Sequence, residues 1–361
     1  MDFKLQSKSL LLPDRGTVTW KSPSNIALVK YWGKKPVQIP ANPSISFTLD
    51  KSATTTKLTY SKREHTHSNY NFELLFEGKP REDFKPKIEK FFERIEAYVP
   101  FVKAYDFVIE TSNSFPHSSG IASSASGMSA LALCLMSIEK KITPQLSQEY
   151  FTKKASFLAR LGSGSASRSI EGGLVTWGQH EMLPGSSNDF ASKYPFQVHA
   201  NFINYQDTIL LVDKGEKKVS STVGHNLMHN HPFSEARFAQ ANNNLRKLKE
   251  ILRSGDLKNF MALVESEALS LHAMMMTSMP YFILMKPATM EIIDKIWGFR
   301  EKTGLPVCFT LDAGANVHVL YPEAEKVKIY EFIKNELVAY CQKGHYICDQ
   351  VGNGATLLAE Q

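Results

Sequence analysis

The sequence predicts an α+β protein built from two domains. Its 361 residues are more than one hydrophobic core comfortably supports, and its 43% of hydrophobic residues is ordinary for a globular chain. Strand-like and helix-like segments follow one another irregularly, which favours α+β domains over a doubly wound parallel sheet. A turn-rich stretch, 183–189, falls near the middle. We therefore expect an N-terminal domain over residues 1–187 and a C-terminal domain over residues 188–361.

The first half is predicted to be rich in strands, with helices between them. Short runs of β-branched, aromatic or alternating residues mark strands, and such runs lie at 17–20, 25–29, 44–49, 54–60, 71–76, 105–110 and 173–177. Apolar residues that recur every three or four positions predict a helix at 89–99, where Phe91, Phe92 and Ile95 carry the pattern. Two more helices are predicted at 123–140 and 147–161.

The second half is predicted to combine long helices with a few strands. It opens with an apolar strand at 208–212 and continues with helices at 235–253, 257–276 and 290–302. Strands at 307–311 and 317–321, a helix at 326–342 and a strand at 346–350 follow.

The composition argues against several kinds of partner. The net charge is +6, but the basic residues are dispersed, and we find no nucleic-acid-binding motif and no basic tail. No apolar stretch approaches the roughly 20 residues that cross a bilayer, and residues 1–21 show no signal-peptide pattern. The four cysteines read as buried thiols of a reducing cytosol, in preference to a metal site around His345. We therefore expect a cytoplasmic protein without nucleic-acid or membrane partners.

The segment from Pro116 to Gly127 is rich in Gly and Ser and leads from a predicted strand into a predicted helix. Backbone N–H groups at a helix N-terminus, together with the helix dipole, bind anions. Gly120 would let the backbone approach a phosphate, and Ser123 and Ser124 could add hydroxyl contacts or help to hold Mg²⁺. The segment lacks the lysine of a Walker loop, so it is not a P-loop. The alternative is a Ser-rich N-cap that only starts the helix.

Two cationic side chains stand in contexts that suit an anionic ligand. Lys30 comes directly after the apolar run 26–29, so it either extends to the surface or enters a polar pocket, and Tyr31 and Lys34 could donate to an anion nearby. Arg168 lies in a run of Gly, Ser and Ala. Its planar guanidinium suits a carboxylate or a phosphate; the alternative is a flexible surface loop.

Three further segments are ambiguous by themselves. Asp312 stands where an apolar strand meets a Gly turn, so it is either a turn former or a catalytic group at a strand end. The hydroxyl-rich segment 217–224 could bind phosphate or form a plain surface turn. His272 lies beside three methionines in a predicted helix, and we interpret it as a structural partner in preference to a base.

Taken in order, these segments resemble the diphosphomevalonate decarboxylases of the GHMP kinase superfamily. The similar segments are 25–34, 44–49, 115–125, 162–169, 172–177, 220–224, 272–273 and 312–316. Lys-Tyr-Trp-Gly-Lys at 30–34 and Ser-Gly-Ser-Ala-x-Arg-Ser at 163–169 are the more specific motifs. The resemblance implies a GHMP kinase fold, with a ribosomal-S5-like α/β domain, a ferredoxin-like α+β domain and the active site in the cleft between them.

The resemblance also implies an activity. It implies ATP and Mg²⁺ as cofactors and mevalonate 5-diphosphate as the substrate, with isopentenyl diphosphate, CO₂, ADP and phosphate as products, in a homodimer. By the same resemblance, Asp312 would orient or deprotonate the tertiary 3-hydroxyl, Lys30 would neutralise charge beside it, and Arg168 would bind the substrate carboxylate. The implied substrate contacts are Tyr31, Lys34, Ser163, Gly164, Ser165, Arg168, Ser221 and Thr222. The implied ATP contacts are Gly120, Ile121, Ala122, Ser123 and Ser124, with Ser123 as the candidate Mg²⁺ ligand.

The chain departs from the family pattern at four places. They are Ala315 in place of Pro, Ser167 in place of Cys, Lys35-Pro36 in place of Arg-Asp, and His225 in place of Met. The last two lie near the expected diphosphate end of the substrate. The alternative function is therefore a GHMP small-molecule kinase, or a decarboxylase acting on mevalonate or its monophosphate. Asp312, Lys30 and Arg168 together favour the decarboxylase, and a non-catalytic relative would be expected to lack one of the first two.

Overall fold

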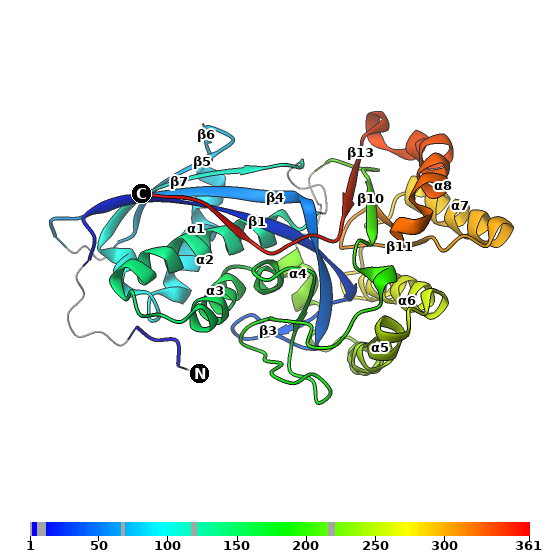
Figure 1. Ribbon diagram of the computed structural model, residues 1–361, viewed down its shortest axis with the longest axis horizontal. Helices are drawn as coiled ribbons and strands as arrows, with labels where there is room; N and C mark the ends of the chain where they lie inside the picture. The colour runs from blue at the N-terminus through cyan, green and yellow to red at the C-terminus, as the bar shows by residue number, and fades with distance from the viewer. Residues whose placement is uncertain (1, 6–11, 66–68, 117–120, 216–220) are drawn as a thin grey trace.

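The computed structural model describes residues 2–5, 12–65, 69–116, 121–215 and 221–361, the side chains of Ser221 and Thr222 excepted. The molecule is elongated, with a large sheet and its helices at one end and a smaller sheet and its helices at the other (Figure 1). The predicted α+β class is confirmed. None of the helices in the described ranges has the length and apolar character needed to cross a bilayer.

Two long antiparallel strands, β1 (Arg15–Val29) and β4 (Ser44–Lys62), run through the large sheet. Each was predicted as two short strands, because polar residues interrupt the apolar pattern. The interruption in β1 is a bulge between Pro23 and Asn25 and not a turn. Ser22 and Ser24 there are buried and bond to Ser169 O and Ile121 O, so tertiary hydrogen bonds offset the cost of burying them.

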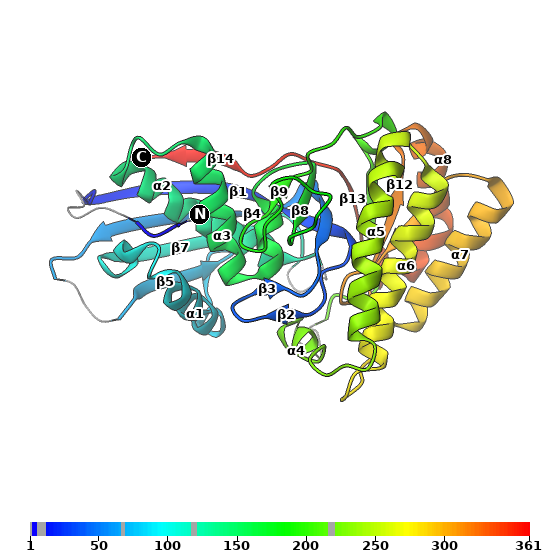
Figure 2. The same cartoon turned by 90° about the horizontal axis from the view of Figure 1, so that it is seen from below.

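The large sheet has eight strands, in the order β14-β1-β4-β7-β5-β6, with β8 paired to β4 and β9 paired to β8. Its other strands are β5 (Asn71–Phe76), β6 (Lys79–Pro80), β7 (Tyr105–Asn113), β8 (Leu174–Trp177), β9 (Ser192–Lys193) and β14 (Thr356–Glu360). Helices α1 (Lys85–Ile95), α2 (Ser123–Ile142) and α3 (Gln148–Gly162) lie on one face of it (Figure 2). Fourteen residues of α2 are buried, which explains why its apolar pattern is nearly continuous.

The smaller sheet is antiparallel, in the order β11-β12-β10-β13. Its strands are β10 (Gln206–Leu210), β11 (Cys308–Thr310), β12 (Val317–Tyr321) and β13 (Tyr346–Gln350). The helices of this half are α4 (Ser221–Asn226), α5 (Ser234–Ser254), α6 (Leu257–Met276), α7 (Pro287–Thr303) and α8 (Lys326–Phe332). Helices α5, α6 and α7 lie side by side in Figure 2. A hairpin of β2 (Lys34–Lys35) and β3 (Ile39–Pro40) stands apart from both sheets.

The predicted helix at 326–342 is wrong in its second half. After α8 the chain makes a π-helical turn, Ile333–Leu337, and then a 3₁₀ turn, Val338–Tyr340. The apolar repeat Ile329, Ile333, Leu337 is buried throughout. Periodicity reports burial and not which backbone hydrogen bonds form, so it does not detect such a turn. The remaining short helical turns are Glu82–Phe84, Pro100–Lys103, Gly164–Ser169, Ala200–Phe202, Glu323–Glu325 and Gln342–Gly344.

The two halves share one buried apolar cluster. Ile26 of β1 and Phe47 of β4 pack in it with Leu248 of α5 and Phe260 of α6. Burying apolar surface contributes roughly 25 cal/mol per Å², so this shared core holds the end of β1 against α5 and α6. Lys30 is the first residue beyond that end.

The end of the chain returns to the first half, which the sequence did not predict. Strand β14 pairs with β1, from Val18↔Glu360 to Lys21↔Thr356. The backbone before it, at Asn353 and Gly354, passes so close to Gly172 that a side chain has no room there. The division at residue 187 stays a prediction, since a strand from the last six residues belongs to the sheet of the first half.

Gly172→Ala is expected to destabilise the fold by about 1–3 kcal/mol, because overpacking forces backbone to move. A methyl group at Gly172 would lie 2.1 Å from the backbone nitrogen of Gly354. The matched control is Gly298→Ala on α7, where a methyl group meets nothing within 4 Å. The control should leave stability equal or higher because Ala favours helix. Urea unfolding of both variants measures the difference, and equal midpoints would contradict the expectation.

Candidate active site

The Gly/Ser loop enters α2 as predicted. Ala122 takes the left-handed conformation (φ 48°) before the helix begins at Ser123. Ser24 Oγ of β1 donates to Ile121 O at 2.5 Å and so anchors this end of the loop. Ser124 is exposed and its Oγ accepts a hydrogen bond from Lys87 Nζ of α1 at 2.8 Å. Gly120 lies outside the described residues.

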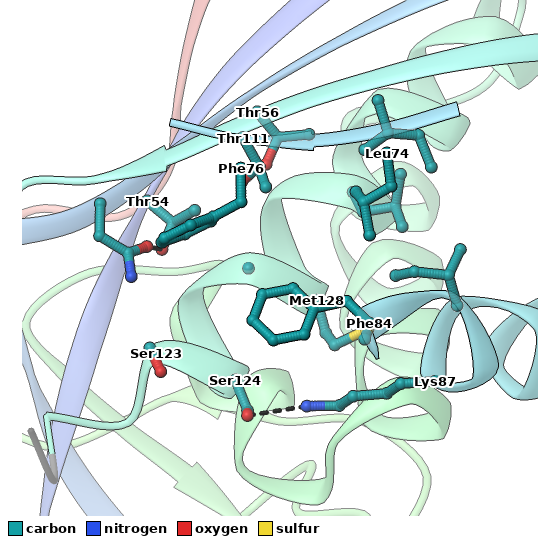
Figure 3. A pocket seen from close by; sticks show the side chains of 15 residues that line it. Thr54, Thr56, Leu74, Phe76, Phe84, Lys87, Thr111, Ser123, Ser124 and Met128 are labelled. Atoms are coloured by element: carbon teal, nitrogen blue, oxygen red, sulfur yellow. Dashed lines mark hydrogen bonds between the residues drawn. The ribbon is translucent and has the colours of Figure 1, made fainter. Parts of the chain in front are cut away.

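A cavity of about 170 Å³ opens beside the start of α2. Figure 3 shows Ser123, Ser124 and Lys87 at one edge of it, and Phe76, Phe84 and Met128 forming apolar walls. The remaining lining residues are Thr54, Thr56, Leu74, Ile88, Ile109, Thr111, Asn113, Gly127 and Leu131. An apolar cavity that ends at an anion-binding helix terminus suits a ligand with a flat ring at one end and phosphates at the other.

Lys30 and Asp312 meet, although 282 positions separate them in the sequence. Lys30 Nζ lies 3.0 Å from Asp312 Oδ1. The Lys30 side chain is 2% exposed and that of Asp312 26%, so the carboxylate is the partner that faces solvent or a ligand. Burial lowers the pKa of Lys30, and Asp312 and Glu267 partly oppose this by raising it. Of the two interpretations of Lys30, the structure shows entry into a polar pocket and not extension to the surface.

Arg168 lies in the 3₁₀ turn Gly164–Ser169 and is buried. Its Nη1 donates to Ser44 Oγ at 2.5 Å, and its Nε to Asn25 Oδ1 at 3.4 Å. Burial lowers the pKa of its guanidinium to about 10, while Asp312 and Tyr31 act in the opposite direction. The turn is therefore a packed platform and not the flexible surface loop of the alternative interpretation.

Strand β1 explains why these segments converge. Ser24 holds the loop before α2, and Asn25 bonds to Ser165 O, Ser169 Oγ and Arg168. Lys30, past the end of the strand, reaches Asp312 in the turn between β11 and β12. Strand β1 thus brings three predicted motifs of the first half, which are the loop before α2, the Arg168 turn and Lys30, together with Asp312 of the second half.

Tyr31 packs between two other rings, at 4.7 Å from Trp177 and 4.3 Å from His225 between ring centroids. Gly164 lies against it: a Cβ there would come 2.8 Å from Tyr31 Oη and 2.9 Å from Trp177. The glycine is therefore required by the close approach of Tyr31. His225 accepts a hydrogen bond from Gly33 N at 3.0 Å, and burial lowers its pKa to about 3, so it is neutral.

The other predicted substrate contacts are placed as follows. Lys34 begins β2 and is half-buried, and burial lowers its pKa. Ser163 caps the end of α3 and Ser165 follows in the 3₁₀ turn that carries Arg168. Ser221 and Thr222 begin α4, so the predicted turn there is a short helix, and their side chains lie outside the described residues.

Sequence reasoning missed three charged residues next to these groups. Lys87 reaches the cavity from α1, and Arg237 and Glu267 surround the backbone of Lys30. Glu267 could have been found from the sequence, because it occupies a core position of α6 between Val264 and Leu271. A carboxylate on the apolar face of a helix is buried only when it is paired.

Both halves of the chain match models of known protein families. Residues 22–189 match the family model for the diphosphomevalonate decarboxylase-like N-terminal domain, and residues 208–356 match that for the mevalonate 5-diphosphate decarboxylase C-terminal domain. A diphosphomevalonate decarboxylase from Ganoderma lucidum is 30% identical over 332 residues, which is 87% of this chain and 80% of that protein. The chain belongs to the diphosphomevalonate decarboxylase family. A family member from Saccharomyces cerevisiae is 28% identical, over 88% of this chain and 81% of that protein.

Solved structures of the family have the same fold. The mevalonate diphosphate decarboxylase from Staphylococcus aureus superposes with a TM-score of 0.80 at 28% identity, covering 96% of this chain and 98% of that one. MDDEF in complex with MVAPP, AMPPCP and magnesium gives a TM-score of 0.80 at 27% identity, covering 95% and 99%. The predicted family and the GHMP kinase fold are confirmed.

Proposed function

We propose that this enzyme catalyses the ATP-dependent decarboxylation of mevalonate 5-diphosphate to isopentenyl diphosphate, CO₂, ADP and phosphate, through phosphorylation of the 3-hydroxyl. The observation that carries the proposal is the buried Lys30 ammonium 3.0 Å from Asp312, with the Arg168 guanidinium close enough to act on both electrostatically. Support comes from the related structure that holds MVAPP, AMPPCP and magnesium.

In the first step, the 3-hydroxyl attacks the terminal phosphorus of ATP, and the bond from that phosphorus to the bridging oxygen breaks as ADP leaves. Hydroxide is a poor leaving group, so phosphorylation must precede the loss of CO₂. Asp312, partly exposed at the turn, accepts a hydrogen bond from the hydroxyl, holds it in line and can take its proton. Lys30 pairs with Asp312 and neutralises charge beside the transferring group. Positioning and such neutralisation are the main requirements of phosphoryl transfer.

In the second step, the phosphate leaves as the bond to the carboxylate breaks. The electron pair of that carbon–carbon bond forms the alkene, and the carbon–oxygen bond pair departs with the phosphate. Positive charge develops at the tertiary carbon. Asp312 gives the proton that it took from the hydroxyl to the departing phosphate, and its carboxylate then stabilises this positive charge. Arg168 would hold the substrate carboxylate in the orientation that this elimination needs, because its guanidinium is fixed by Ser44 and Asn25.

ATP would lie with its adenine in the cavity beside α2 and its phosphates at the helix N-terminus. The apolar walls and the Lys87–Ser124 pair fit the two ends of that ligand. Mg²⁺ usually binds through phosphate oxygens and a few protein oxygens, and it neutralises charge on the phosphates. Ser123, which lines the cavity at the first residue of α2, would contribute one such oxygen.

Lys87→Met is expected to raise the KM for ATP about tenfold or more, because a hydrogen bond to a charged group contributes about 1.5–3 kcal/mol. Steady-state kinetics with ATP varied would measure it. Lys85→Met is the matched control, since Lys85 is on the same helix but pairs with Glu82 at the surface. An ATP KM that changes equally in both variants would show that Lys87 does not contact the nucleotide.

The activity itself is tested by incubating the purified protein with ATP, Mg²⁺ and mevalonate 5-diphosphate and following ADP and isopentenyl diphosphate together. Equal formation of both products, abolished by Asp312→Ala, supports the proposal. ADP without the alkene would indicate a kinase that stops after phosphorylation. If neither product forms, the assignment of mevalonate 5-diphosphate as the substrate is wrong, and mevalonate and its monophosphate are the next substrates to test.

We also infer that the protein is cytoplasmic, as its cysteines and N-terminal segment indicate, and a homodimer, as the resemblance implies. Met279, Tyr281 and Ile283 are 83%, 73% and 67% exposed, which is apolar surface that a second subunit could cover. Sedimentation velocity measures the oligomeric state directly, and a monomer at micromolar concentration would rule out the homodimer.

A further inference from the structure

The peptide groups on both sides of Lys30 are held by side chains from other elements. Its backbone N–H donates to Glu267 Oε2 of α6 at 2.8 Å. Its carbonyl accepts from Asn42 Nδ2 at 2.9 Å and from Arg237 Nη2 of α5 at 3.5 Å. A lysine side chain has four rotatable bonds, so fixing its backbone and burying its stem are what direct the ammonium.

Glu267 is the centre of this arrangement. It is completely buried, and both of its oxygens are engaged. Besides Lys30 N–H, it accepts from Asn244 Nδ2 at 2.6 Å and forms a two-pronged ion pair with Arg237, which is also buried. A buried carboxylate with this many donors is held in one orientation.

Helix α6 also holds the backbone of Asp312, through His272. His272 lies five positions after Glu267 on α6 and is 1% exposed. Its Nε2–H donates to the backbone carbonyl of Asp312 at 3.1 Å. The predicted role of His272, a structural partner and not a base, agrees with this contact. Glu267 and His272 thus connect one rigid helix to the backbones of Lys30 and Asp312, which come from different halves of the molecule.

We propose that α6 is a positioning helix for the reaction: Glu267 and His272 hold the peptide groups of Lys30 and Asp312 and so set the distance between the ammonium and the carboxylate. The proposal rests on the proposed function for the roles of Lys30 and Asp312. Neither Glu267 nor His272 needs to contact the substrate.

The negative charge of Glu267 also acts on the Lys30 ammonium, and the direction of its effect on the Lys30 pKa is known. The groups that face Lys30 are Asp312 in the β11–β12 turn, Glu267 on α6, Arg168 in the 3₁₀ turn, Arg237 on α5 and Asp207 on β10. Among them, Glu267 raises the pKa of Lys30 and Arg168 lowers it. Removing the negative charge at 267 leaves Arg237 unbalanced and lowers the pKa of Lys30 further. Activity that needs protonated Lys30 must then be lost at a lower pH.

The first variant is Glu267→Gln, which keeps the shape and an acceptor for Lys30 N–H but removes the charge. We expect the alkaline limb of its pH–kcat profile to move to lower pH, with little change in the KM for substrate. The matched control is Glu139→Gln, which also breaks a buried ion pair, with Lys154, in the first half of the chain. The control should lose comparable stability and keep the pH profile of the unmodified enzyme.

The second variant addresses His272. His272→Ala removes the donor to Asp312 O and is expected to lower kcat on the order of 100-fold, as displacement of a reacting group does. His272→Gln supplies an amide N–H at nearly the same place and should recover most of that loss. Equal loss in both, with KM unchanged, would show that the hydrogen bond does not position Asp312.

A readout that needs no turnover separates this proposal from the proposed function. Lysine labelled with ¹³C at Cε allows the titration of Lys30 to be followed by NMR, with Lys30→Met for assignment. A lower Lys30 pKa in Glu267→Gln, and not in Glu139→Gln, supports the electrostatic role even if the substrate assignment fails. An unchanged Lys30 titration together with an unchanged alkaline limb would overturn the proposal while the decarboxylase activity stands.

Discussion

Asp312→Asn is expected to lower kcat/KM by about 10³–10⁴-fold, because a positioned general base contributes about 10²–10⁴-fold and this carboxylate also stabilises the developing cation. The amide keeps the size of the side chain but cannot take the proton of the hydroxyl. It also removes the negative charge 3.0 Å from the buried Lys30 ammonium. Coupled assay of ADP release, with isopentenyl diphosphate measured by mass spectrometry, gives the rate of both steps.

Asp294→Asn is the control for this substitution, because Asp294 is exposed on α7 in the same half of the chain. It should behave as the unmodified enzyme does. Circular dichroism and thermal unfolding show whether Asp312→Asn remains folded. If the Asp312→Asn enzyme is folded and retains more than a tenth of the activity, Asp312 is not a catalytic residue.

Lys30→Met is expected to reduce kcat by about 10²–10³-fold, the loss seen when one preorganised donor is removed from a developing charge. The unmodified enzyme should also lose activity as the pH rises through the pKa of Lys30. Burial lowers that pKa below the ordinary lysine value, so the loss comes at a lower pH than for an exposed lysine. The protonated form is active, so the limb is a decrease with increasing pH.

A pH–kcat profile of the unmodified enzyme and of Lys30→Met tests this. The alkaline limb attributed to Lys30 should be missing from the residual activity of the variant. Lys21→Met is the control, because Lys21 is an exposed lysine on the same strand, β1. If the residual activity of Lys30→Met keeps the same alkaline limb, another group titrates there.

Most secondary structure could be predicted from the sequence, because each element buries one face and its periodicity reports that face. Strand β5, helix α6 and strands β12 and β13 have the predicted bounds. The errors have one cause: tertiary contacts decided what local pattern could not. The polar residues that interrupt β1, Ser22 and Ser24, form hydrogen bonds with the Arg168 turn and with the loop before α2. Strand β14 forms because β1 offers it an edge to pair with.

The sequence by itself determined the family, the order of its motifs and the residue types that the chemistry requires. An ammonium, a guanidinium and a carboxylate follow apolar or small-residue segments, and each segment alone left two interpretations open. For Lys30 and Arg168 the tertiary structure decided between the two interpretations by burying both side chains, and it placed Asp312 3.0 Å from the lysine. It alone showed that Glu267 and His272 hold these groups from α6. The physical reason is that a buried charge is stable only beside its partner, and a partner 282 positions away leaves no local trace.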